Sequence, residues 1–366
     1  MDKALMWTAL PFHFWTAVAF VLGCMVGSFL NVCIHRLPLG ESVVSPPSHC
    51  PHCGYSIPWF LNIPLVTWVW LRGRCANCHA RISARYFLVE LLTGVFFAGC
   101  WLSFGRIAPS LALASAVILC GLIVGTFTDF EHLIVPDQIT FGGMVAGVLC
   151  SFLVPSLHFS VPGFIRLQSP WAGLRESVIG MAVGAGLVYA ILRLGKLFLG
   201  RQKLDLAPGT RVVFTESGVK LPEEEIAYEE LFYRKTDAVE LAAQQVELID
   251  RCYAAAPVRL TMDRLSVGGD SYEPDKVPCL EVVTDRIVLP REAMGPADVT
   301  VMAAIGAFLG WPAVLFSLAL SSLLGTAVGG TLIAFKRRDW SNRIPYVPYI
   351  AAGAVIWIFG GYRWVQ

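Results

Sequence analysis

Two aspartates and four cysteines are the residues of this 366-residue chain whose types and spacing are most suited to chemistry. Asp129 follows an apolar run and Asp298 precedes one, so each carboxyl group is expected at the mouth of a membrane-crossing segment, where a buried charge is costly. For Asp298 helix capping is a sufficient alternative, because Pro296 suits a first helical turn and an acid there favours the positive end of the helix dipole. Asp129 lies at the opposite end of its helix, where the dipole disfavours an anion. Capping therefore does not explain Asp129.

The chemistry that two such acids could perform is that of an aspartic protease. Two carboxyl groups close together share one proton, because like charges separate their titrations. The ionised group can then take a proton from water while the protonated group polarises the carbonyl of the bond to be cleaved. No Ser-His or Cys-His arrangement in the sequence competes for this role.

Four of the eleven cysteines form two pairs, in which two residues separate the members of each pair. Twenty-one residues lie between the pairs, and this layout is typical of a zinc ribbon, in which two tight turns present four thiolates. Four cysteine ligands leave no open coordination position, so the predicted zinc is structural rather than catalytic. Free thiols or disulfides are the alternatives, and a reducing compartment disfavours the latter. The predicted ligands are Cys50, Cys53, Cys75 and Cys78.

The composition is that of a polytopic membrane protein, with 55% hydrophobic and only 15% charged residues. The net charge is only +1 and the sequence has no basic tract, so we expect no nucleic-acid partner. The expected surroundings of the protein are the lipid bilayer. The N-terminus has no small-x-small cleavage site, so we expect the first apolar run to be a permanent helix.

Eight apolar stretches are near the roughly 20 residues that a membrane-spanning helix needs. The sixth is the shortest, because Gly310-Trp311-Pro312 interrupts it. The predicted fold is all-α and polytopic, with about eight transmembrane helices, a small cytoplasmic zinc-ribbon loop and a cytoplasmic α+β insert. The stretches are about Phe14–Cys33, Tyr86–Phe104, Pro109–Phe127, Ile134–Val154, Val178–Leu199, Val299–Trp311, Val314–Phe335 and Val347–Tyr362.

Loop charge predicts the orientation of the chain in the membrane. Arginines gather after the first stretch and basic residues follow the seventh, whereas the loops of the other parity hold few. Because basic loops stay in the cytoplasm, the N-terminus is expected outside. The third helix then ends, at Asp129, on the cytoplasmic face where the sixth begins, at Asp298. The two carboxyl groups are therefore predicted to meet at one membrane surface.

The soluble insert has a different character from the rest of the chain. The spacing of apolar residues from Ile226 to Val246 favours a helix, whereas Arg211–Thr215, Val258–Met262 and Leu280–Val283 favour short strands. Gly268-Gly269-Asp270 is expected to form a turn. The predicted regions are a first transmembrane helix over 1–35, a loop with the cysteine pairs over 36–85, transmembrane helices two to five over 86–199, the insert over 200–291, and helices six to eight over 292–366.

Glu90 lies early in the second apolar stretch and is a candidate functional acid. One interpretation is an ion pair with Arg85 that fixes the helix, and the other is a carboxylate that faces a cofactor cavity. Ser28 and Asn31 place small and amide side chains within the first stretch, where close helix packing explains them.

Six motifs in this order resemble those of the type IV prepilin peptidases, which are membrane aspartic proteases. They are GSFLNVCIHRLP, SPPSHCPHC, CANC, ISARYFLVELLTG, TDFEHLIVPD and AIGAFLGW. The resemblance covers the first 150 residues and residue 292 to the end, and leaves the insert outside.

The resemblance implies that Asp129 and Asp298 are the catalytic pair of a bacterial inner-membrane enzyme. It implies cleavage of prepilin or pseudopilin leaders on the cytoplasmic side, after a glycine that precedes a hydrophobic helix. It also implies N-methylation of the new N-terminus with S-adenosylmethionine, for which Glu90 and Gly94 are candidates. Asp137 and Glu292 are candidates for positioning the substrate, although Asp137 after Pro136 also suits the start of a helix.

The chain departs from the family pattern at the second aspartate. The family has G-x-G-D followed by Val-Lys, whereas this chain has Gly295-Pro296-Ala297-Asp298 followed by Val299-Thr300. Alanine lacks the backbone freedom of glycine, and proline restricts its own φ and the residue before it. An active peptidase is the favoured interpretation. A peptidase that lacks methyltransferase activity and a degenerate prepilin-binding scaffold are the alternatives.

Overall fold

A computed structural model of the protein describes residues 11–158, 169–199, 201–215, 217–221, 225–232, 237–248, 251–274, 277, 279–290, 296–335 and 345–360. The chain divides into two compact units. The helical unit comprises Met1–Tyr189 and Pro296–Gln366, and the sheet unit comprises Ala190–Gly295. Each unit has its own core, and they are considered in turn.

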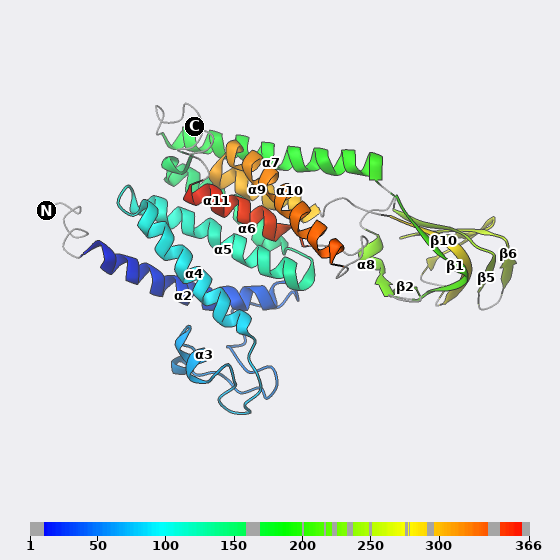
Figure 1. The fold of residues 1–366 in the computed structure, drawn as a ribbon, viewed down its shortest axis with the longest axis horizontal. Coiled ribbons are helices and arrows are strands. Elements are labelled where there is room, and N and C mark those ends of the chain that lie inside the picture. The colour runs from blue at the N-terminus through cyan, green and yellow to red at the C-terminus, as the bar shows by residue number, and fades with distance from the viewer. Residues whose placement is uncertain are drawn as a thin grey trace. The chain divides into compact units, whose positions relative to one another are not determined.

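All eight predicted apolar stretches form helices in the described residues. Five of them contain segments long and apolar enough to cross a membrane, and three shorter apolar helices accompany these. The long helices are α2 (Phe12–Arg36), α4 (Ala84–Phe104), α5 (Pro109–His132), α7 (Pro170–Leu199) and α10 (Trp311–Ala334). The shorter ones are α6 (Asp137–Leu153), α9 (Pro296–Leu309) and α11 (Val347–Phe359). The chain is therefore a polytopic membrane protein, with five crossings supported by length and composition (Figure 1).

Helices α2 and α4 pack at very close range because glycines face each other. A Cβ atom at Gly23 would lie 2.8 Å from the Cα of Gly94, and one at Gly27 would lie 2.7 Å from the Cα of Glu90. Small residues allow two backbones to approach in this way, and dispersion contacts then hold helices together in lipid. The loop between them carries a 3-10 turn (Trp59–Leu61) and α3 (Val66–Trp70).

Helices α6 and α9 run side by side in the same direction. Gly143 lies against Ala304 and Gly147 lies against Ala307, so successive turns of one helix meet successive turns of the other. Ser151 Oγ donates a hydrogen bond of 2.9 Å to the Ala307 carbonyl group, and it lies 2.9 Å from His158 Nε2 in the 3-10 turn Pro155–His158. Because the two helices are parallel, the first residues of α6 and the first residues of α9 lie at the same end.

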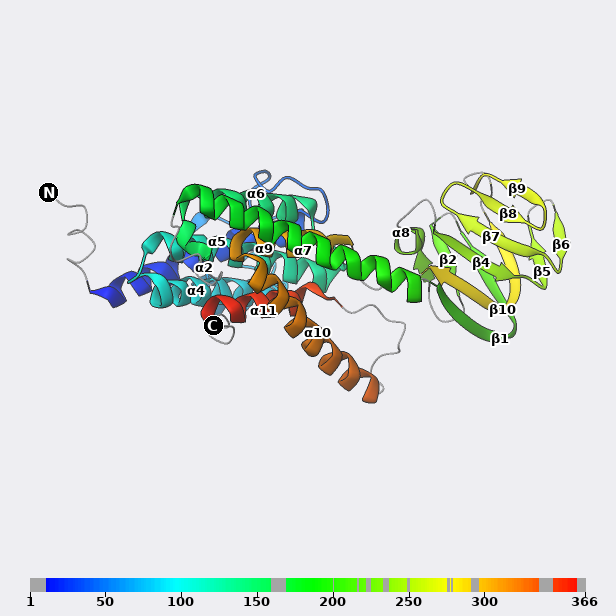
Figure 2. The ribbon, with the colours of Figure 1, turned by 90° about the horizontal axis from the view of Figure 1, so that it is seen from above.

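The sheet unit is one antiparallel arrangement of ten strands in the order β3-β2-β1-β10-β4-β7-β8-β9, with β5 paired to β10 and β6. Figure 2 shows the strands curving around a common interior, which includes buried Val212, Val282 and Ile287. β1 (Arg201–Phe214) and β10 (Leu280–Pro290) are the longest strands and pair along most of their length. The others are β2 (Gly218–Lys220), β3 (Glu225–Ala227), β4 (Ala238–Ala242), β5 (Gln245–Glu247), β6 (Cys252–Ala254), β7 (Pro257–Thr261), β8 (Leu265–Val267) and β9 (Asp270–Tyr272).

The expected helix from Ile226 to Val246 is wrong. The described residues of that range form strands β3, β4 and β5, with only the four-residue α8 (Tyr228–Leu231) as helix. In β4 the side chains of Val239 and Leu241 are buried while their neighbours are not, which is the two-residue period of a strand. The strands expected near 211, 258 and 280 and the turn at Gly268-Gly269 are present. A short run of apolar residues fits a helix or a strand equally well. Hydrogen bonding of β4 to β7 and β10 therefore decides that this region is a strand.

Candidate functional site

Asp129 lies in the last turn of α5, and only 7% of the residue is exposed. Its Oδ2 accepts a hydrogen bond of 2.9 Å from the backbone N–H of Val347, the first residue of α11. The positive end of α11 therefore compensates a carboxylate that the C-terminal end of α5 disfavours. No local pattern predicts this partner, which lies 218 residues away in the chain.

Asp298 lies in the first turn of α9, and 5% of it is exposed. Pro296 opens the helix, as expected for that residue type, while Gly295 lies outside the described residues. Thr300, which stands where the family has lysine, donates to the Ala297 carbonyl group at 2.9 Å. The helix thus begins normally in spite of the altered motif.

The two aspartates lie at the same end of the helical unit. α5 ends where α6 begins, since only a short connection separates them, and α6 and α9 run in parallel. The end of α5, which carries Asp129, and the start of α9, which carries Asp298, therefore lie at one end. Val347 at the start of α11 contacts Asp129 there as well.

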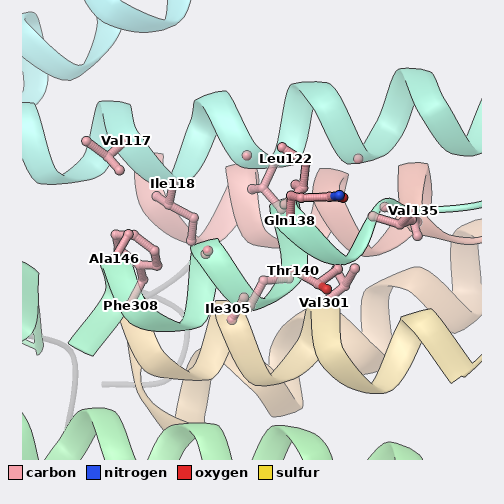
Figure 3. Close-up of a pocket in the computed structure, with 17 residues that line it drawn as sticks. Val117, Ile118, Leu122, Val135, Gln138, Thr140, Ala146, Val301, Ile305 and Phe308 are labelled. Atoms are coloured by element: carbon pink, nitrogen blue, oxygen red, sulfur yellow. The ribbon is translucent and has the colours of Figure 1, made fainter. Parts of the chain in front are cut away.

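A cavity of about 210 Å³ extends along the helices from this end. Its lining includes Gly125, four residues before Asp129, and Val301, three residues after Asp298, so both aspartates stand one helical turn from it. The lining is largely apolar, and small residues of α5, α6 and α9 keep it open. In Figure 3, Val135, Thr140 and Val301 mark the end near the aspartates, and Val117, Ile118, Ala146 and Phe308 mark the other.

Two polar residues of this cavity, Gln138 and Thr140, were not singled out from the sequence. Both stand in the first turn of α6. Two polar residues at the start of an otherwise apolar helix are the sequence feature that could have identified them as candidate site residues. Asp137, the expected positioning residue, is exposed at the first position of α6 and is absent from the cavity lining. Glu292, the other one, lies outside the described residues.

The four predicted cysteine ligands come together in the loop between α2 and α4. Their sulfur atoms all lie within 4.8 Å of one another. Cys50 and Cys78 are 3.8 Å apart and Cys53 and Cys75 are 4.0 Å apart, close to the edge of about 3.8 Å of a tetrahedron with metal–sulfur distances of about 2.3 Å. The backbone N–H groups of Cys78 and Asn77 lower the pKa of the Cys75 thiol, which favours the thiolate that a metal binds, while the other three cysteines raise the pKa of Cys78. The residues present fit one tetrahedral ion.

Glu90 is buried against α2, and the first of its two interpretations, an ion pair with Arg85, is not what the structure shows. Arg85 instead forms an ion pair with Glu131 at the end of α5, which joins the start of α4 to the helix of Asp129. The Glu90 Oε2 atom accepts a hydrogen bond of 2.8 Å from the backbone N–H of Leu65, just before α3. Gly94 lies one turn further along α4, where a Cβ atom would approach the Cys24 sulfur to 2.6 Å. Both candidates for methylation therefore lie at tight packing positions.

Two protein-family models match this chain, and most of the sheet unit lies outside both of them. "Bacterial Peptidase A24 N-terminal domain" matches residues 21–104, and "Type IV leader peptidase family" matches residues 116–204 and 278–330. The first covers the cysteine loop and the second covers Asp129 and Asp298. No solved structure matches the chain.

Relatives named "Prepilin leader peptidase/N-methyltransferase" also match the chain. The one from Myxococcus xanthus is 39% identical over 213 residues, covering 54% of this chain and 62% of the relative. The one from Aeromonas hydrophila is 28% identical over 383 residues, covering 97% of this chain and 94% of the relative. The one from Pectobacterium carotovorum is 32% identical over 212 residues and 70% of its length is covered. The chain therefore belongs to the type IV prepilin leader peptidase family.

Proposed function

We propose that this protein is a membrane aspartic endopeptidase that cleaves the leader of type IV prepilins or pseudopilins, with Asp129 and Asp298 as its catalytic pair. The single observation that carries the assignment is their common position. Two buried acids from separate helices stand at one end of the helical unit, each one turn from the same cavity. The names of the relatives supply the substrate class.

The reaction needs one ionised and one protonated carboxyl group beside a water molecule. The ionised acid takes a proton from the water as the water oxygen attacks the carbonyl carbon of the peptide bond, and the protonated acid donates to the carbonyl oxygen, which gives a tetrahedral gem-diol. As the C–N bond breaks, the first acid passes its proton to the leaving amine nitrogen and the second acid takes one back from the gem-diol, so that both acids return to their starting states. The Val347 N–H group that donates to Asp129 holds one carboxylate oxygen in place. One aspartate of the pair acts as the base and the other as the proton donor.

The cavity supplies a place for the apolar side of a substrate. Its lining of small and aliphatic residues matches a hydrophobic segment rather than a polar peptide, and Gln138 and Thr140 are the polar groups close to the aspartate end. A prepilin has such a hydrophobic helix directly after the cleaved bond. Asp137 at the rim and Glu292 remain proposed contacts for the polar leader.

Cleavage of a synthetic prepilin by the purified full-length protein tests the proposal. We expect Asp129→Asn and Asp298→Asn each to reduce the cleavage rate at least about 100-fold, the scale of a lost acid or base. Asp263→Asn, in an exposed turn of the sheet unit, is the matched control and should cleave at the wild-type rate. Wild-type cleavage by either active-site variant would remove the assignment.

Methylation of the new N-terminus with S-adenosylmethionine is the second proposed activity, and the names of the relatives support it. Glu90 and Gly94 act in it by holding α2, α4 and the loop in register, as their contacts suggest. Mass spectrometry of the cleaved product, with and without S-adenosylmethionine, should show one added methyl group. Cleavage without any methyl transfer would leave the peptidase assignment intact and remove this one.

Zinc is the metal that we propose for the four cysteines, because an all-thiolate tetrahedral set is typical of structural zinc. Such an ion orders the loop and takes no part in cleavage. The exposed arginines of this loop, Arg72, Arg74 and Arg81, favour the cytoplasmic side of the bacterial inner membrane. The aspartate end is joined to the loop through Arg85 and Glu131, so we place the active site on that same face and the N-terminus outside.

A further inference from the structure

The loop between α2 and α4 contains an aromatic segment, residues 59–70, that exposes unusually large apolar side chains. Trp59 and Trp70 are 81% and 82% exposed, which is rare for the largest apolar residue type. A contiguous exposed apolar surface of this kind marks a site of contact with a protein or a membrane. The exposed members are Trp59, Phe60, Ile63, Val66, Val69 and Trp70.

The segment folds back along α4 instead of extending away from it. The N–H group of Leu65 reaches the Glu90 carboxylate at 2.8 Å, and the ring of Trp68 lies 5.1 Å from that of Phe87. Glu90 is six residues beyond Ala84, so its Cα lies about 9 Å along the helix from the first residue of α4. Residues 65–68 of the segment therefore lie beside the first two turns of α4, a helix long and apolar enough to cross a membrane. Figure 1 shows α3 near this end of α4.

We propose that the aromatic segment is embedded in the headgroup and upper acyl region of the bilayer, and that Glu90 is the residue that positions it there. Tryptophan side chains favour this layer because the ring is apolar and its N–H group can still meet water. The helices on either side of the loop also expose large apolar side chains, since Leu88 of α4 and Phe29 of α2 are about half exposed. Lipid is therefore the occupant that fits.

Charge around the segment supports a bilayer with anionic lipids. The exposed side chains of Arg72 and Arg74 follow the segment directly in the chain, and that of Arg81 lies further along the same loop. Juxtamembrane cations are attracted to an anionic leaflet, so these residues favour phosphatidylglycerol headgroups. An aromatic surface bordered by cations is the pattern of an interfacial element.

The role of Glu90 follows from the backbone that it holds. Leu65 has φ of 61°, a conformation that a residue with a branched side chain adopts only when its surroundings hold it. The Glu90 carboxylate accepts the N–H group of this residue immediately before α3. An acceptor at this position therefore keeps the segment folded back on α4.

Tryptophan quenching in vesicles of brominated phosphatidylcholine and phosphatidylglycerol tests the proposal with the full-length protein. The chain has eleven tryptophans, so the signal of the segment is the difference between wild type and W59F/W70F. We expect this difference signal to be quenched by the brominated lipid and protected from aqueous acrylamide. Trp68→Phe is the matched control in the same segment, because Trp68 packs against Phe87 and is not exposed like its neighbours.

A difference signal that acrylamide quenches and brominated lipid does not would show a water-exposed segment and overturn the proposal. A signal protected from both quenchers would show a protein partner or a second copy and overturn it equally. Two substitutions test the role of Glu90, and both variants should first give the same far-UV circular dichroism spectrum as the wild type, which shows that they are folded. Glu90→Ala should move the signal from the lipid-quenched to the acrylamide-quenched class, whereas Glu90→Gln, which keeps an acceptor oxygen, should not. An unchanged signal in Glu90→Ala would remove Glu90 from the proposal.

Discussion

Asp129 and Glu90 are two buried acids in neighbouring helices of the same unit, yet their surroundings differ in one decisive respect. Each accepts a backbone N–H group, from Val347 at 2.9 Å and from Leu65 at 2.8 Å, and each is less than a tenth exposed. Asp129 stands one turn from an open cavity, whereas Glu90 is enclosed where α2 and α4 pack most closely. The same stabilising contact is therefore made by the proposed catalytic acid in one place and by an acid enclosed between packed helices in the other.

The difference shows that burial and a hydrogen-bond partner do not identify a catalytic acid. Membrane proteins retain ionisable residues for function, but also where an acceptor is needed to satisfy a backbone group. What separates the two is space for a substrate beside the carboxyl group. Four changes break or sharpen this comparison, in order of decreasing expected effect.

The largest contrast is between the conservative amide variants of the two acids. Asp129→Asn is expected to lower prepilin cleavage at least about 100-fold, and Glu90→Gln less than about tenfold, because only the first group exchanges a proton with the substrate. Initial rates from the same membrane preparation, normalised to protein amount, measure both. Equal losses in the two variants would contradict the distinction.

A bulky side chain in the cavity should block substrate binding while it leaves both aspartates in place. A Cβ atom at Gly121 would meet nothing within 4 Å, so Gly121→Phe can place its ring in the cavity that Gly121 lines. Cleavage should fall about tenfold or more, the scale of one lost apolar contact with a substrate. Gly330→Phe is the control, because Gly330 of α10 is equally open and lies outside the lining. Equal activity of the two variants would argue against the cavity as a substrate site.

Metal removal should affect the loop beside Glu90 far more than the aspartate end. The purified protein is expected to contain about one zinc per chain, because the four sulfur atoms form one tetrahedral set. Cys50→Ser with Cys75→Ser should abolish metal binding and make residues 36–85 sensitive to protease, while Cys252→Ser, at an exposed strand position, should change neither. Elemental analysis and limited proteolysis provide the readout, and a metal-free native protein would refute the ribbon.

The smallest effect is expected where α2 and α4 touch. Gly94→Ala should destabilise the protein by about 1–3 kcal/mol, because the new methyl group would lie 2.6 Å from the Cys24 sulfur. Cys24→Ala removes that sulfur and should recover part of the loss in the double variant, so the two changes are not additive. Thermal unfolding in detergent measures all three proteins. Full additivity would show that the contact is not the cause.

Local patterns in the sequence predicted much of this molecule. Long apolar runs determine helices by themselves, and the spacing of Cys50, Cys53, Cys75 and Cys78 determines a ligand set, so both were accessible. The common end of Asp129 and Asp298 followed from counting membrane crossings.

Contacts between segments that are distant in the chain could not be predicted from local sequence patterns. The Val347 N–H group at Asp129, the pairing of Arg85 with Glu131 and the Leu65 contact of Glu90 all depend on tertiary packing. The insert was mispredicted for a related reason. Residues such as Val239 and Leu241 fit a helical spacing, but their antiparallel partners in β7 and β10 make them a strand.

The central claim is that Asp129 and Asp298 act on one water molecule as a unit, and the cleavage rate of the double variant tests it most directly. Residues that act together are strongly non-additive, because removal of either disables both. Single-turnover cleavage of a synthetic prepilin by D129N, D298N and D129N/D298N should give one common residual rate. A double variant whose loss equals the product of the two single losses would show independent contributions and contradict the account.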